Sequence, residues 1–64
     1  MEKIAEFVKK YRKILNLTQE RLAAYAGVST KFIIELEASK KTLQIDKVLD
    51  VLKVFDATLI PEHY

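Results

Sequence analysis

The stretch from Thr18 to Glu37 constrains the fold most, because it places the chain's single glycine between two short segments with helical patterns. Thr18 and Ser29 each precede one of these segments, where a side-chain hydroxyl can accept a hydrogen bond from the free N–H groups at a helix start. Gly27 follows the first segment and can adopt the positive φ that ends a helix and turns the chain. The sequence therefore predicts two helices that meet at a tight corner.

Apolar and small side chains recur at three- and four-residue steps through both segments, which predicts that they form the inner faces of the pair. These residues are Leu22, Ala23, Ala26, Val28, Ile33 and Leu36. The small side chains at 23 and 26 allow the two helices to approach closely. Such an arrangement, over about residues 18–37, is a helix-turn-helix, whose second helix normally reads nucleic acid.

Two further helices are predicted around this corner. The first covers Glu2 to Leu15, and Asn16 after it is a residue that tolerates the left-handed conformation. Its lysines at 9, 10 and 13 form either a solvated helix end, matched to the helix dipole, or a patch that faces phosphates. The last helix covers about Ile45 to Phe55 and is apolar around most of its circumference, so we expect one face to pack on the domain and another on a second copy.

The chain continues with a short apolar and β-branched segment that predicts a C-terminal β-strand over about residues 57–61. A lone strand cannot satisfy its own backbone hydrogen bonds, and the sequence contains no second strand. The same strand of another subunit is the expected partner, which predicts a two-fold homodimer. The alternative is a tail laid across the first helix.

Composition limits the remaining function classes. The 64 residues make one domain, over 1–64, with a net charge of +2 and no cysteine, so disulfides and thiolate metal ligands are excluded. No apolar run approaches the roughly 20 residues that span a bilayer, and we expect a cytoplasmic protein without a membrane partner. One glycine and one histidine, His63, leave no phosphate loop, triad or metal site. We therefore expect neither catalysis nor a cofactor.

The stretch LTQERLAAYAGVS, the following ELE and the later IDKVLDVLKVF are similar to the Xre/Cro family of helix-turn-helix repressors. Nearly the whole chain resembles the HipB-like antitoxin branch. The resemblance implies an all-α, lambda-repressor-like domain of four to five helices, followed by a short C-terminal strand that pairs across a dimer. It also implies an internal salt bridge between Arg12 and Glu37.

The resemblance also implies which residues contact DNA. The base-reading residues would be Thr30, Lys31 and Glu35, and the phosphate contacts would be Gln19 and Ser29. The loop lysines Lys40 and Lys41 are placed to reach the DNA backbone as well. A recognition helix enters the major groove by its N-terminal end, which agrees with the roles of residues 30 and 31.

Three residues depart from the family pattern or leave alternatives open. Phe32 either packs internally or touches a thymine methyl group. Ile34, which also either packs internally or touches DNA, stands where the family commonly has a polar residue, and Ser39 stands where it usually has glycine.

We predict a sequence-specific transcriptional repressor that binds a palindromic double-stranded operator. It would also be the antitoxin and autoregulator of a HipBA-like toxin–antitoxin operon, with a HipA-like kinase toxin as partner. The alternative is a protein-interaction module with a helix-turn-helix fold that binds DNA only weakly.

Overall fold

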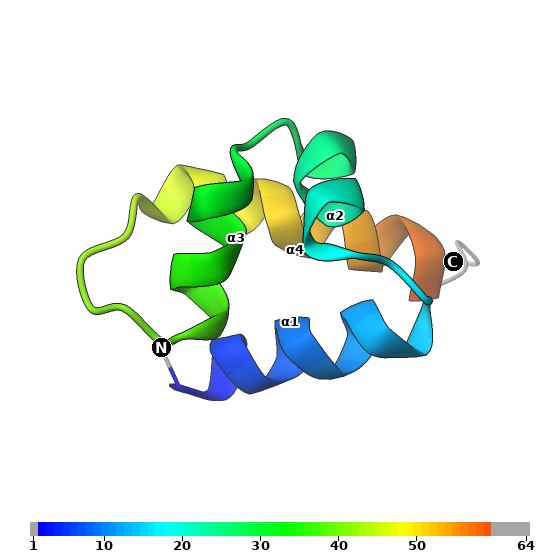
Figure 1. Cartoon of the computed structure of the whole chain (residues 1–64), viewed down its shortest axis with the longest axis horizontal. Helices are drawn as coiled ribbons and strands as arrows, with labels where there is room; N and C mark the ends of the chain where they lie inside the picture. Colours follow the sequence, from blue (N-terminus) through cyan, green and yellow to red (C-terminus); the bar gives the residue numbers. More distant parts are fainter. Residues whose placement is uncertain (1, 60–64) are drawn as a thin grey trace.

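The computed structural model describes the backbone of residues 2–59 and the side chains of residues 2–56. The described chain forms four helices: α1 (Glu2–Ile14), α2 (Gln19–Ala26), α3 (Thr30–Glu37) and α4 (Ile45–Leu59). Figure 1 shows α4 passing behind α2 and α3, with α1 below them along the lower edge of the view. The all-α prediction is confirmed for the described residues.

Both predicted N-caps are present at the corner. The Thr18 hydroxyl oxygen accepts a hydrogen bond of 3.0 Å from the Arg21 N–H at the start of α2. The Ser29 hydroxyl oxygen accepts one of 3.0 Å from the Phe32 N–H at the start of α3. Each bond satisfies a backbone donor that has no partner within its own helix, and so fixes where that helix begins.

Within two residues of their ends, helices α1, α2 and α3 are each followed by a residue with positive φ: Asn16 at 58°, Gly27 at 75° and Ser39 at 63°. After each of them, the next N–H in the chain donates to a carbonyl in the last helical turn, over 3.0 to 3.1 Å. These left-handed ends satisfy helix carbonyls and redirect the chain within a few residues. The predicted conformations of Asn16 and Gly27 are confirmed.

The core lies where the four helices meet, and every helix contributes to it. α2 packs against both α3 and α4, and α1 packs against α3. The buried cluster consists of Val8, Leu22, Ala23, Phe32, Ile33, Leu36, Val48, Val51 and Phe55. This shared core fixes α3 relative to the other three helices, with one side buried.

Only some of the apolar side chains around α4 are buried in this core. Val48, Val51 and Phe55 are buried, whereas Leu49 is 50% exposed and Ile45 is 60% exposed. A groove between α1 and α4 is lined mainly by apolar side chains, among them Phe7 and Leu49. The prediction that α4 has a second apolar face is confirmed, and its contact with a second copy stays a prediction.

The predicted strand over 57–61 is wrong for its first residues, because α4 continues through residues 57–59 and ends at Leu59 instead of Phe55. A helix satisfies backbone hydrogen bonds within its own segment, whereas a strand needs a partner that a single chain of this sequence does not supply. Ala57 and Leu59 also have favourable helix propensities. Residues 60 and 61, His63 and the alternative tail across α1 lie outside the described residues.

Candidate nucleic-acid interface

Helix α3 has one buried side and one open side. Phe32, Ile33 and Leu36 face the core, with exposed fractions of 8%, 0% and 0%. Lys31 and Ile34 lie on the other side, where both are exposed. The open side belongs to the helix that follows the corner, which is the helix that such a motif presents to DNA.

The start of α3 combines polar side chains with free backbone donors. Ser29 is exposed, Thr30 is half-buried and Lys31 is exposed. The first N–H groups of a helix attract anions, since they have no partner within the helix and lie at the positive end of its dipole. The structure thus brings the predicted phosphate contact at 29 and the predicted base readers at 30 and 31 together at one helix end.

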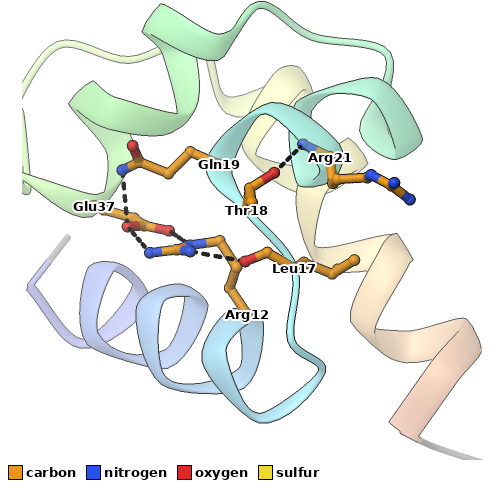
Figure 2. A network of polar contacts seen from close by, with 6 residues as sticks. All are labelled: Arg12, Leu17, Thr18, Gln19, Arg21 and Glu37. Carbon is orange, nitrogen blue, oxygen red and sulfur yellow. Dashed lines mark hydrogen bonds and ion pairs between the residues drawn. The ribbon is translucent and has the colours of Figure 1, made fainter.

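A polar network ties the C-terminal end of α3 to α1 and α2 (Figure 2). The Arg12 Nε donates to Glu37 Oε2 at 2.7 Å, and its Nη2 donates to Glu37 Oε1 at 3.1 Å. The Arg12 Nη1 donates to the Leu17 carbonyl oxygen at 2.8 Å. The side chains of Arg12 and Glu37 are 13% and 3% exposed, so the pair is largely shielded from water. The predicted salt bridge is confirmed.

Gln19 takes part in the same network. Its Nε2 donates to Glu37 Oε1 at 3.2 Å, so the amide points into the domain from the first residue of α2 (Figure 2). The sequence indicated only a phosphate contact for this side chain. The amide group has two N–H donors, and the bond to Glu37 uses one of them.

Two further predicted contact residues pair with each other. The Lys40 Nζ lies 3.3 Å from Glu35 Oε2, with side chains that are 48% and 27% exposed. An exposed pair of this kind contributes only about 0–1 kcal/mol, so a DNA phosphate or base can displace either partner at little cost. Lys41, next in the loop, is exposed.

Phe32 and Ile34, which the sequence left open, take opposite sides of α3. Phe32 is 8% exposed and belongs to the core cluster, which agrees with internal packing and not with a thymine contact. Ile34 is 48% exposed. Sequence reasoning did not assign it to the interface, although it stands three residues after Lys31, the spacing that places two side chains on one helix side.

Other chemistry has little support among the described residues. No group of three or more acidic, histidine or cysteine side chains there is placed to hold a metal ion. Within the same part of the chain, every buried polar side-chain atom has a hydrogen-bond partner. No helix in it has the length and apolarity needed to cross a membrane.

The tight corner, the capped second helix and its open side define a helix-turn-helix domain. The helix-turn-helix family matches residues 8–60, and the chain belongs to this family. It is 46% identical over 56 residues to the "uncharacterized HTH-type transcriptional regulator y4mF" of Sinorhizobium fredii, an alignment that covers 88% of this chain and 74% of the relative. No solved structure gives a significant match. The name of the relative describes a transcriptional regulator, and membership of the HipB-like branch stays a prediction.

Proposed function

We propose that this protein is a sequence-specific DNA-binding repressor that acts by occupying a promoter. The observation that carries the proposal is the open side of α3, where Lys31 is exposed beside the capped start of the helix. The helix-turn-helix family match and the relative named as a transcriptional regulator support the same function.

In this proposal, base edges are read from the first turns of α3. Lys31 donates to guanine O6 or N7, and Thr30 offers a hydroxyl and a methyl group. Glu35 accepts from cytosine N4 once its pair with Lys40 opens. Phosphate contacts come from Ser29, Lys40, Lys41 and the second N–H of the Gln19 amide, and they supply most of the affinity.

The proposed repressor binds as a homodimer. Two α3 helices related by a two-fold axis would read half-sites about 34 Å apart on a palindromic operator. The exposed apolar side chains along the groove between α1 and α4, including Phe7 at 39% and Leu49 at 50%, support a second copy as the molecule that covers this surface. The groove also carries Lys3, Lys53 and Asp56, and charges of both signs suit a self-complementary contact.

Fluorescence anisotropy tests the DNA-reading function. The purified protein is titrated with a duplex from the region upstream of its gene and with a scrambled duplex, across a salt series. We expect salt-dependent binding that favours the upstream duplex, and Lys31→Ala should remove about 1–3 kcal/mol of this preference. Lys47→Ala is the matched control, since it removes the same charge from an exposed position on α4.

Equal and weak binding of both duplexes would contradict the repressor proposal. It would favour the second candidate, a protein-interaction module, for which the exposed apolar groove between α1 and α4 is the specific observation. Loss of preference in Lys47→Ala to the same extent as in Lys31→Ala would contradict base reading by Lys31, because the preference would then not depend on the side chain at that position.

The antitoxin role is the second half of the proposal and has a separate test. The resemblance of nearly the whole chain to the HipB-like antitoxin branch supports it, with a HipA-like kinase toxin as partner and the shared operon as target. Co-expression with the neighbouring gene product should give a complex that co-purifies. A repressor that binds its operator but not the neighbouring product would contradict the antitoxin half alone.

A further inference from the structure

The open side of α3 carries an apolar side chain near its middle. Ile34 is 48% exposed, although the residue before it in the chain, Ile33, is completely buried. Ile34 belongs neither to the core cluster nor to the partly buried residues that pack against it. The domain therefore does not require this side chain for its core.

Helix stability does not explain an isoleucine at this position either. Ile34 lies inside an eight-residue helix, where a β-branched residue has a lower propensity than alanine, leucine or the charged residues with straight side chains. At 48% exposure, Ile34 gains only part of the free energy of full burial in the free protein. Its apolar surface becomes useful once another molecule covers it.

Ile34 shares its side of α3 with the proposed base readers. It stands three residues after Lys31 and four after Thr30, the spacings that align side chains along one side of a helix. Glu35, the next residue, pairs with Lys40 over 3.3 Å in the free protein. The side of α3 that carries the proposed base readers therefore also presents one exposed apolar side chain, Ile34.

We infer that Ile34 is a specificity-determining residue that packs against the 5-methyl group of a thymine, once in each half-site. This inference rests on the proposed function, because it requires α3 to enter the major groove. Among unmodified base pairs, the thymine methyl is the apolar group that the major groove displays. Contact between this methyl and the isoleucine removes apolar surface of both from water, which favours thymine at that position.

Substitution of thymine by deoxyuridine tests the inference, because it removes only the methyl group. The probe is the consensus duplex that the purified protein selects from a random-sequence library, with each thymine replaced in turn and binding followed by anisotropy. We expect one thymine per half-site at which deoxyuridine weakens binding about fourfold, the effect of burying one methyl group. Ile34→Ala should bind the two duplexes equally.

Ile14→Ala is the matched control, since Ile14 is a 56% exposed isoleucine on α1. This variant should keep the fourfold difference. The inference is overturned if no deoxyuridine substitution weakens binding of the wild-type protein, or if the same substitution weakens binding of Ile34→Ala to the same extent. Failure to select any consensus would instead overturn the proposed function, so the two failures are distinct.

Discussion

The residues with positive φ show how single side chains shape this domain. Asn16, Gly27 and Ser39 occupy equivalent places after α1, α2 and α3, with φ between 58° and 75°. Glycine adopts this conformation without steric cost, asparagine tolerates it, and serine is strained in it. Ser39 therefore stores strain at the end of α3, directly before the loop that carries Lys40 and Lys41.

Ser39→Gly should raise the free energy of unfolding by about 0.5–1 kcal/mol. The substitution removes a left-handed penalty of about 1–2 kcal/mol, and the greater freedom of glycine in the unfolded chain offsets part of the gain. Urea denaturation followed by circular dichroism measures the change.

The reverse substitution, Gly27→Ser, is the matched control. A Cβ added at Gly27 meets no heavy atom within 4 Å, so its cost comes from the φ of 75° and not from a clash. It should lower the free energy of unfolding by about 1 kcal/mol. A destabilised Ser39→Gly would show that the serine side chain contributes more than its backbone strain costs.

At the scale of the elements, α3 is held at both ends by polar contacts and along its inner side by the core. Ser29 caps its start, and Glu37 binds Arg12 and Gln19 near its end. Contacts of this geometry set the position and the rotation of the helix about its axis. They keep Lys31 and Ile34 on the exposed side of the helix.

Removing one partner of the shielded Arg12–Glu37 pair should lower the free energy of unfolding more than replacing both partners with apolar side chains. Glu37→Gln leaves the guanidinium without its counter-ion at 13% exposure, and we expect a loss of about 2–3 kcal/mol. The double variant Arg12→Met, Glu37→Leu should lose less stability than Arg12→Met alone or Glu37→Leu alone. Apolar side chains of similar volume avoid the desolvation of both charges.

Chemical denaturation of the two single variants and the double variant measures this coupling. Additive losses would contradict the prediction, since they would show that the two charges act independently. The double variant also tests whether the network orients α3. If this stable protein lacks the network and binds DNA less well, the network contributes to the orientation of α3.

For the whole molecule, the most prominent surface feature is the exposed apolar groove between α1 and α4. A 64-residue domain buries a small core, and further burial at an interface is a natural source of stability. The described side chains leave Ile45 and Leu49 exposed on the same helix that supplies Val48 and Val51 to the core. This division between two sides of α4 is the basis for the proposed dimer.

Leu49→Lys should shift the protein from dimer to monomer and weaken operator binding, because it places a charge in the apolar contact. Folding of the single domain should change little, since Leu49 is 50% exposed. Sedimentation velocity measures the oligomeric state, with anisotropy on the same samples. Ile14→Lys, at a 56% exposed position outside the groove lining, should leave the dimer intact. An unchanged dimer in Leu49→Lys would exclude this surface as the interface.

Much of the fold was predictable from sequence, and the candidate site was predictable in part. The helix starts at Thr18 and Ser29, the turn at Gly27 and the inner face of the corner were all expected, as was the Arg12–Glu37 pair that the family resemblance implied. The contact of Gln19 with Glu37 and the pairing of Glu35 with Lys40 were not predicted. Each contact depends on where its partner side chain lies in the folded chain.

The sequence by itself determined the local features of this protein. Caps, the left-handed ends at Asn16 and Gly27, and helical periodicity depend on neighbours within one or two turns, so residue type and spacing suffice to predict them. Only the tertiary structure decided that Phe32 joins the core while Ile34 faces outward, and that residues 57–59 extend α4. Those outcomes depend on which surfaces the other helices cover and on which backbone groups find partners within a single chain, and both are properties of the assembled fold.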